Sequence, residues 1–244
     1  MAASALAGKT VLIAGASSGM GKATAHAAAA AGARVWLLAR RGDMLAELAA
    51  EIEREGGEAA WTAGDATDRG VVTKAVADTT ERFGRIDVLV NSVGTNIRER
   101  ALQDLTADGW HELLAVNLDA AFVLTQEVLP TFRRQGEGLL IHISSSAAKR
   151  ADRSGVGYQA SKAGMVGLAR ATMEEERVNG IRVTVIFPGF TDTAMVARRP
   201  EPPTPEMLSA ALCPEDVAQM CVAVMALPAR AYVPELLLYP SRWT

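Results

Sequence analysis

The chain has 244 residues, of which 49% are apolar and 22% are charged; this balance is typical of one folded globular domain over 1–244. Its net charge of −3 gives no electrostatic reason to bind nucleic acid or anionic membranes, both of which require a basic surface. The segment 1-MAASALAGKTVLIAG-15 lacks a basic region before its apolar run, and no run of ~18 apolar residues follows, so we expect a cytoplasmic protein without a membrane span.

Short apolar runs alternate with longer helical stretches along the chain. Each run is apolar on both faces, as parallel strands covered by helices must be. The order predicts an α/β fold, a doubly wound Rossmann fold whose seven-stranded parallel sheet is flanked by helices. Prolines in 198-RRPEPPTPE-206 preclude a long helix, which predicts a mobile loop before a last helix at Pro214. The runs lie at 10–14, 34–39, 58–63, 86–91, 138–143, 181–187 and 232–239.

A glycine-rich turn follows the first run in 14-AGASSGMG-21, where Gly15, Gly19 and Gly21 lead into an Ala-rich helix. Glycine lets backbone N–H groups approach a pyrophosphate, and the N-terminus of the helix adds partial positive charge. The turn therefore predicts a dinucleotide site, although a glycine-rich turn without a ligand would have the same composition. Its spacing, Gly-x-x-x-Gly-x-Gly, differs from the Gly-x-Gly-x-x-Gly of many dinucleotide binders.

The second run ends in Ala39-Arg40-Arg41, where NAD-binding domains place an acidic residue that holds the ribose 2′-hydroxyl. Ala39 offers no carboxylate. Arg40, with Arg41 as a second candidate, offers donors suited to a 2′-phosphate, which predicts NADP(H) as the cofactor. The alternative, stronger for Arg41 than for Arg40, is that the two arginines only begin a solvated helix.

Tyr158 and Lys162 stand four positions apart in 157-GYQASKAG-164. On a helix they would project from the same face, and an ammonium group beside a phenol should lower the pKa of the phenol. The pair could therefore serve as an acid/base device. Taken alone, it could equally be a chance pair on a solvated helix face.

Several motifs together resemble the short-chain dehydrogenase/reductase family, in its branch of about 250 residues. The separation of 13 positions between Ser145 and Tyr158 is usual in that family. Each motif also follows a predicted strand or lies in the next helix, and ligands of open α/β sheets bind at the carboxyl ends of the strands. The resemblance covers nearly the whole chain and rests on the glycine-rich turn, 91-NSVG-94, Asn117, Ser145, Tyr158-x-x-x-Lys162 and 188-PGFTDT-193.

The resemblance implies catalytic roles for four residues. Tyr158 would be the general acid or base at the substrate oxygen, and Lys162 would bind the nicotinamide ribose and tune the phenol. Ser145, the middle of three serines, would hold the substrate oxygen. Asn117, in 114-LAVNLDA-120, would help to hold a water that relays protons from Lys162, unless it only bonds to neighbouring backbone within its helix.

The resemblance also implies an NADP (NADPH) site along the strand ends. Asp65 would contact the adenine, and Thr193 the nicotinamide carboxamide. The family's usual Asn-Asn-Ala-Gly is Asn-Ser-Val-Gly at 91–94, so we expect a slightly different shape beside the ribose. The expected cofactor-binding residues are Gly15, Ser17, Ser18, Gly19, Met20, Gly21, Arg40, Arg41, Asp65, Ala66, Asn91, Ser92, Gly94, Tyr158, Lys162, Pro188, Gly189, Thr191 and Thr193.

By the same resemblance, the partners are a small carbonyl or alcohol substrate and further copies of the chain, in a dimer or tetramer. A basic cluster, Lys149, Arg150 and Arg153, either receives an anionic substrate or belongs to the surface or an interface. Cys213 and Cys221 match no zinc spacing, and we expect no metal. The family logic builds the substrate pocket from Thr95, Asn96, Ala147, Phe190, Met195, Arg198 and Arg199.

The expected function is therefore an NADP(H)-dependent oxidoreductase that interconverts a secondary alcohol and a ketone or aldehyde. The alternatives are a non-catalytic nucleotide sensor and a reductase of acyl thioesters. A sensor would be expected to lose Tyr158, Lys162 or Ser145, and all three are present. The chain also departs from the glycine-containing ending common in the family, because it closes with Arg242, Trp243 and Thr244.

Overall fold

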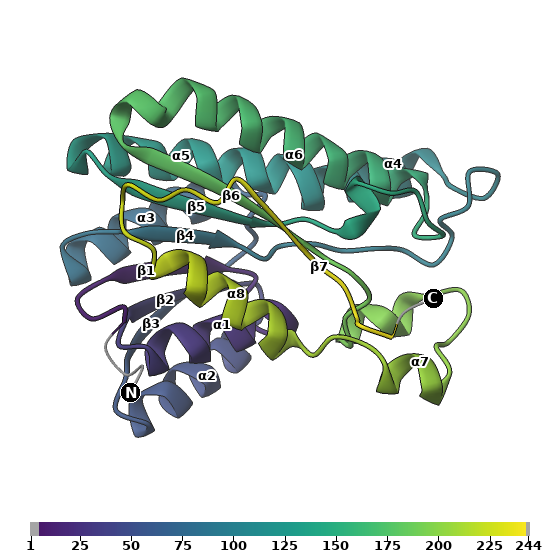
Figure 1. Cartoon of the computed structure of the whole chain (residues 1–244), viewed down its shortest axis with the longest axis horizontal. Helices are drawn as coiled ribbons and strands as arrows, with labels where there is room; N and C mark the ends of the chain where they lie inside the picture. Colours follow the sequence, from purple (N-terminus) through teal and green to yellow (C-terminus); the bar gives the residue numbers. More distant parts are fainter. Residues whose placement is uncertain (1–4, 243–244) are drawn as a thin grey trace.

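Seven parallel strands form one sheet in the computed structural model, which describes residues 5–242, so that Trp243 lies outside the described residues. The predicted fold class and all seven strands are confirmed (Figure 1). The last strand is shorter than predicted because Pro234 and Pro240 border it, and proline cannot donate to the ladder. In sheet order the strands are β3 (Glu58–Ala63), β2 (Arg34–Ala39), β1 (Thr10–Ala14), β4 (Val88–Asn91), β5 (Gly138–Ile143), β6 (Ile181–Pro188) and β7 (Glu235–Leu238).

Helices cover both faces of this sheet (Figure 1). One face packs against α1 (Gly19–Ala30), α2 (Gly42–Arg54) and α8 (Pro214–Met225), which share one apolar cluster with the strands. The other face packs against α3 (Arg69–Phe83), α5 (Ala120–Gln135) and α6 (Val156–Glu176), which share a second cluster. Because both faces are covered, β1, β4, β5 and β6 are buried over their whole length, and their continuous apolar runs follow from this burial, whereas the edge strands β3 and β7 are partly exposed.

The helix ends follow from local sequence. The side chain of Asp68 accepts a hydrogen bond from the backbone N–H of Gly70 at the start of α3, and Gly84, at φ +79°, ends that helix. The predicted start of the last helix is also found, because α8 begins at Pro214 and Asp216 accepts from the N–H of Cys213 at 2.8 Å. Such caps satisfy N–H and carbonyl groups that a helix end otherwise leaves without partners.

A continuous helical segment runs over Ala107–Gln135, through α4 (Ala107–Leu114), a π-helical turn (Ala115–Asp119) and α5. Its mean hydropathy reaches 1.3 over 18 residues, so by length and composition it could cross a membrane. The segment contains no run of ~18 consecutive apolar residues, the pattern that would have marked it in the sequence. In this fold, however, α5 is a core helix, since Leu124, Val128 and Phe132 are fully buried against the sheet.

Two short helices occupy the proline-rich segment before α8: a 3₁₀ turn (Ala194–Arg198) and α7 (Pro205–Ser209). This agrees with the prediction that the segment has no long helix, whereas its mobility stays a prediction. In Figure 1 the segment forms a lobe beside the carboxyl ends of the strands.

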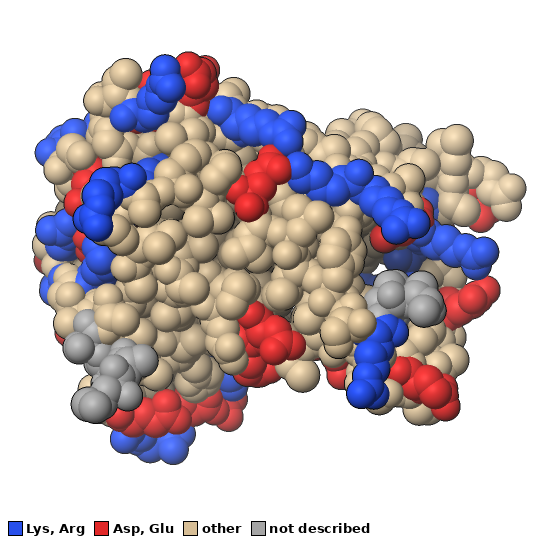
Figure 2. All heavy atoms as spheres, viewed as in Figure 1, with Lys and Arg blue, Asp and Glu red and all other residues tan. Residues whose placement is uncertain are grey.

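Charged side chains of both signs are mixed on the face shown in Figure 2, and they are few across its middle, where β7 and α8 lie in Figure 1. Leu237 and Tyr239 near the edge strand are 48% and 45% exposed. This face of the molecule is thus less charged than its rim.

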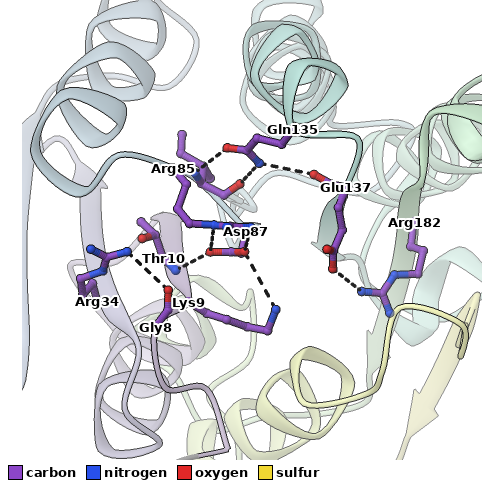
Figure 3. A network of polar contacts seen from close by, with 10 residues as sticks. Gly8, Lys9, Thr10, Arg34, Arg85, Asp87, Gln135, Glu137 and Arg182 are labelled. Carbon is purple, nitrogen blue, oxygen red and sulfur yellow. Dashed lines mark hydrogen bonds and ion pairs between the residues drawn. The ribbon is translucent and has the colours of Figure 1, made fainter.

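A polar network joins the strands at their amino ends (Figure 3). Asp87, immediately before β4, accepts from the backbone N–H of Thr10 at 2.8 Å and pairs with Arg85 and Lys9. The side chain of Gln135 bonds to both backbone groups of Ile86. These contacts fix β1 and β4 relative to α5 at the amino ends of the strands, opposite the carboxyl ends.

Candidate active site

A cleft opens at the carboxyl ends of β1 and β4. β1 lies between β2 and β4 in the sheet, so the strands that follow β1 in the chain are placed first on one side of it and then on the other. Ligands of open α/β sheets bind at such a switch point. The cleft consists of two cavities of about 440 Å³ and 540 Å³. The smaller is called the β1 cavity and the larger the Tyr158 cavity. They form one continuous site, because both are lined by Met20, Ser92, Gly94, Thr193 and Met195.

The glycine-rich turn forms one wall of the β1 cavity. Gly15 has φ +83°, a conformation that favours glycine, and a Cβ atom there would lie 2.7 Å from the backbone of Ser92. A Cβ at Gly21 would lie 2.2 Å from the carbonyl oxygen of Gly15. The turn therefore needs glycine at both positions, and Ser18, the residue immediately before α1, lines the cavity.

Arg41 is fixed against this turn. Its Nη2 donates to Ser17 Oγ at 3.0 Å and to Ser18 Oγ at 2.9 Å. Arg40 also lines the cavity, but its side chain is 72% exposed and its only ion pair among the described residues is a 3.9 Å contact with Asp65. Of the two side chains, Arg41 is thus the more firmly held in this structure, whereas the sequence favoured Arg40 as the phosphate ligand, and the ligand itself stays a prediction.

Two side chains shape the turns after β3 and β4. Asp65 accepts from both the backbone N–H and the hydroxyl of Thr67 at 2.9 Å. Asn91 accepts from the N–H of Val93 at 3.0 Å and lies 3.3 Å from Nδ1 of His142. Burial lowers the pKa of His142 to about 4, so this ring is neutral within the sheet.

Tyr158 and Ser145 meet in the Tyr158 cavity. A hydrogen bond joins the two side chains, and Ser145 Oγ also accepts from the N–H of Ala147 at 3.2 Å. Burial nevertheless raises the pKa of Tyr158 above its ordinary value, and the hydrogen bond with Ser145 opposes this only in part. The phenol consequently keeps its proton at neutral pH.

Lys162 lies behind this pair, 3% exposed, with its Nζ donating to the carbonyl oxygen of Ile143 at 3.1 Å. The Nζ atom is 6.0 Å from the centroid of the Tyr158 ring. Burial lowers the pKa of Lys162 to about 8. The prediction that Lys162 holds the phenol's pKa below its ordinary value is wrong for this structure, because removal of the phenol from water outweighs the hydrogen bond that favours its ionised form.

Asn117 lies in the π-helical turn and is fully buried. Its Oδ1 accepts from the backbone N–H of Thr95 at 2.8 Å, while its Nδ2 donates to the Thr95 carbonyl and to Ser161 Oγ. The side chain therefore bonds to a segment far away in sequence rather than to its own helix. It fixes the strand-end segment at Gly94, where a Cβ would lie 3.1 Å from Lys162 Nζ.

The segment after β6 closes the cleft from the other side. Gly189 donates its N–H to the carbonyl of Leu238 at 2.7 Å, and Thr191 Oγ1 donates to the carbonyl of Gly189. Thr193 faces Gly19 across the cleft, because a Cβ on Gly19 would lie 3.4 Å from its methyl group. This segment and the glycine-rich turn therefore approach each other at the junction of the two cavities.

Most of the predicted site residues line the cleft. Gly21, Asn91 and Asn117 do not line either cavity and instead support residues that do. The Tyr158 cavity contains Ser145, Tyr158, Lys162, Pro188, Gly189 and Thr191. The β1 cavity contains Gly15, Ser17, Ser18, Gly19, Met20, Arg40, Arg41, Asp65, Ala66, Ser92, Gly94 and Thr193.

The predicted substrate pocket is only partly reproduced. Asn96, Phe190, Met195 and Arg199 line the Tyr158 cavity, but Ala147 lines neither cavity. Thr95 and Arg198 face the β1 cavity, where Arg198 donates to Thr95 Oγ1 at 2.5 Å. Sequence reasoning missed the lining residues Arg100, Asp152, Ser154, Val196 and Tyr239.

The basic cluster is divided by the fold. Lys149 forms an ion pair with Glu235 at the start of β7, which Arg170 also contacts at 2.7 Å. Arg150 is exposed and lines neither cavity, whereas Arg153 lines the Tyr158 cavity. Lys149 and Arg150 are therefore surface residues, and only one member of the cluster faces the site.

Comparison with known proteins places this site in context. A family model described as short chain dehydrogenase matches residues 9–203. The 3-oxoacyl-(acyl-carrier-protein) reductase of Thermotoga maritima is 34% identical over 220 residues, covering 88% of this chain and 89% of that protein.

Two solved structures are similar over almost the whole chain. A metagenomic short-chain oxidoreductase in complex with NADP is 31% identical, with a TM-score of 0.84 and coverage of 98% of this chain and 99% of that one. An alcohol dehydrogenase from the archaeon Thermococcus sibiricus, complexed with 5-hydroxy-NADP, is 30% identical, with a TM-score of 0.87 and coverage of 97% and 98%. The similarity thus includes both cavities.

Proposed function

The chain belongs to the short-chain dehydrogenase/reductase family of oxidoreductases, and from this premise we propose that it is an NADP(H)-dependent enzyme. It interconverts a secondary alcohol and a ketone or aldehyde on a small or medium substrate, with Tyr158 as the general acid or base. The observation that carries the proposal is the meeting of Tyr158, Ser145 and Lys162 in a cavity continuous with the glycine-rich β1 cavity.

The β1 cavity fits a dinucleotide. The missing side chain at Gly21 lets the tight turn at Gly15 pack on α1, and the turn lines the cavity beside the positive end of the helix, where a pyrophosphate would bind. Ser92, Gly94 and Thr193 also line the Tyr158 cavity, where the nicotinamide half would lie. When bound, this cofactor supplies or accepts the hydride.

The choice of NADP(H) over NAD(H) rests on the end of β2. Ala39 supplies no carboxylate for a ribose 2′-hydroxyl, and Arg41 is held on Ser17 and Ser18 with donors left for a 2′-phosphate. A guanidinium fixed before binding loses less side-chain entropy than a mobile one. We therefore assign the main phosphate contact to Arg41, with the exposed Arg40 as its partner. Two similar structures, described as complexes with NADP and with 5-hydroxy-NADP, support this choice.

The four catalytic residues have distinct tasks. In the reductive direction the carbonyl carbon receives a hydride and its oxygen receives the Tyr158 proton, so that the C=O bond becomes a CH–OH group. Ser145 donates a hydrogen bond to the oxygen as negative charge develops on it. The Tyr158 phenol holds its proton at neutral pH, as a general acid must before it reacts, and Lys162, still charged at pH 7, supports the reprotonation of the phenol from solvent. Asn117 holds the segment that Lys162 packs against.

A panel of ketones, aldehydes, oxo acids and quinones with NADPH or NADH tests this proposal through the absorbance of the reduced cofactor. We expect turnover with NADPH on at least one carbonyl. Binding of NADPH without turnover on any member would instead favour the nucleotide sensor.

Reduction of a 3-oxoacyl thioester is a second candidate, favoured by the similarity to the reductase of Thermotoga maritima. A 3-oxoacyl thioester of N-acetylcysteamine, compared with the matching 3-oxo ester, distinguishes the two. A strong preference for the thioester would select this alternative.

Self-association, in a dimer or tetramer, is part of the proposal. The weakly charged face over β7 and α8, with Leu237 and Tyr239 exposed, supports an interface between copies (Figure 2). The outer side of α5 also exposes Phe122. Sedimentation velocity would give the number of copies in the assembly. The cytoplasmic location and the single domain over 1–244 stay predictions.

A further inference from the structure

We propose that the substrate carries a carboxylate, and that Arg100 binds this group with Arg199 in the Tyr158 cavity. The substrate would then be an oxo acid in the reductive direction and a hydroxy acid in the oxidative direction. This inference rests on the proposed function, because it names the substrate class of the same site. It depends on two arginines that the assigned chemistry does not use.

Arg100 is a charged side chain buried in the wall of the cavity. It is 8% exposed and lines the Tyr158 cavity. One nitrogen, Nη2, donates to the carbonyl oxygen of Arg198 at 3.0 Å, whereas Nη1 and Nε have no hydrogen-bond partner among residues 5–242 and, of these two, only Nε is enclosed by the protein. A guanidinium has five N–H donors, and a buried donor without a partner is costly. A carboxylate in the cavity would supply an acceptor for Nη1.

The position of Arg100 is set by packing. Gly155, at φ +93°, lies so close that a Cβ there would be 2.6 Å from both Cβ and the carbonyl oxygen of Arg100. Nothing larger than glycine fits against this side chain. This packing restrains the base of the side chain, and the hydrogen bond from Nη2 to Arg198 holds the guanidinium before any ligand arrives, which reduces the entropy lost on binding.

Arg199 brings a second positive charge to the same cavity. Its guanidinium lies over the ring of Phe190 at 4.9 Å, and it lines the Tyr158 cavity. Burial lowers the pKa of Arg100, and the charge of Arg199 lowers it further. In the part of the chain that the structure describes, neither arginine has a carboxylate within ion-pair distance. Two like charges that repel each other in a cavity favour an anion between them.

Asp152 is the acidic group that faces this pair. It lines the cavity and raises the pKa of Arg100, but its Oδ1 is already occupied by the N–H of Ser154 at 2.8 Å and its side chain is exposed. Arg153 lines the cavity as well, so the basic groups outnumber the acidic one. The cavity thus keeps an excess of positive charge.

The charged pair is close enough to the reacting groups to select a substrate. Arg100 and Tyr158 each shift the pKa of the other, and both line the same cavity. A substrate whose oxo group bonds to Tyr158 and Ser145 could thus place a carboxylate against Arg100.

The test uses the 2-, 3-, 4- and 5-oxohexanoates, each with its methyl ester, which differs by the loss of charge. With NADPH we expect at least one acid to exceed its ester in kcat/KM. In Arg100→Gln the acid-to-ester ratio should fall roughly ten- to a hundredfold, the effect of losing a charge-assisted contact. Arg100→Lys should restore part of the ratio, and Arg199→Gln should lower it. The proposal is overturned if the wild type prefers every ester, or if Arg100→Gln leaves the ratio unchanged.

Arg98→Gln is the matched control, since Arg98 belongs to the same segment but is exposed and lines neither cavity. It should leave the acid-to-ester ratio unchanged. Thermal melting shows whether each variant is folded, and Arg199→Gln keeps the test decisive if Arg100→Gln does not fold.

A binding measurement separates this proposal from the proposed function. Calorimetric titration with hexanoate and hexanamide, both of which cannot be reduced, needs no turnover. We expect hexanoate to bind at least about tenfold more tightly than hexanamide, and this preference to disappear in Arg100→Gln. Equal binding of the two compounds overturns the carboxylate site. Absence of reduction across the panel, together with selective hexanoate binding, would overturn the proposed function alone.

Discussion

Lys162 donates a hydrogen bond from Nζ to the carbonyl oxygen of Ile143 at 3.1 Å, at the carboxyl end of β5. This contact fixes an ammonium group beneath the cleft, where it is 3% exposed. Because burial lowers its pKa to about 8, the charge that serves the active site opposes folding at neutral pH.

Lys162→Met should therefore stabilise the cofactor-free protein at pH 7. The folded pKa of about 8 lies below the ordinary value of 10.5, so the unfolded chain binds more protons between these values and wild-type stability rises with pH there. The burial penalty is about 3 kcal/mol at pH 7 and the lost hydrogen bond about 1, which leaves the variant about 2 kcal/mol more stable. Urea unfolding at pH 7 and pH 10 should show this advantage disappearing at the higher pH; an advantage equal at both would contradict it.

Tyr158→Phe removes only the hydroxyl and tests the chemistry. We expect kcat to fall at least ~10²-fold while NADPH still binds, because the lost contact is with the reacting oxygen. Lys162→Ala should weaken both turnover and cofactor binding. Fluorescence titration with NADPH, alongside turnover on any accepted carbonyl, makes the comparison. A Tyr158→Phe enzyme that kept more than about a tenth of wild-type kcat would exclude a general-acid role.

Arg41→Ala should raise the KM for NADPH by roughly ten- to a hundredfold and change that for NADH little, because only NADPH has the 2′-phosphate. Arg40→Ala should have the smaller effect, since its side chain is mostly exposed and not held by the glycine-rich turn. Steady-state kinetics of both variants with both cofactors decides the order. A larger effect at Arg40 would reverse our assignment.

The buried, neutral His142 should make the stability of the fold sensitive to acid. Its pKa of about 4 lies below the ordinary 6.5, so its contribution to stability is present above pH 6.5 and is lost as pH falls toward 4. Between pH 7 and pH 5 this loss is roughly 2 kcal/mol. His142→Gln should show a smaller loss of unfolding free energy over the same interval. Parallel pH dependence of the two proteins would show that another group is responsible.

The sequence predicted the fold well because strand formation here is local. Runs such as 10–14 are apolar on both faces, and this pattern alone indicates a buried parallel strand. The range predicted for the last strand, 232–239, is too long because only the pairing with β6 shows that the strand starts after Pro234.

The details of the site depend on contacts between distant segments. Arg41 is ordered by Ser17 and Ser18, on a different turn, so two adjacent arginines could not be ranked from the sequence. Arg100 has no local signal for burial, since its environment comes from Gly155 and Arg198. The sign of the Tyr158 pKa shift likewise depends on removal from water by the surrounding fold.

The polar network around Asp87 lies at the opposite end of β4 from the cleft. The four residues of this strand span about 13 Å, beyond the range over which the effects of substitutions usually couple. We therefore expect that the effects of substitutions at the two ends on the free energy of unfolding add. In a double-mutant cycle of Asp87→Asn with Tyr158→Phe, the two losses of unfolding free energy should add to within about 0.5 kcal/mol. The two ends of the sheet can then change independently during evolution: stability can be altered at the amino edge while substrate preference is altered at the carboxyl edge.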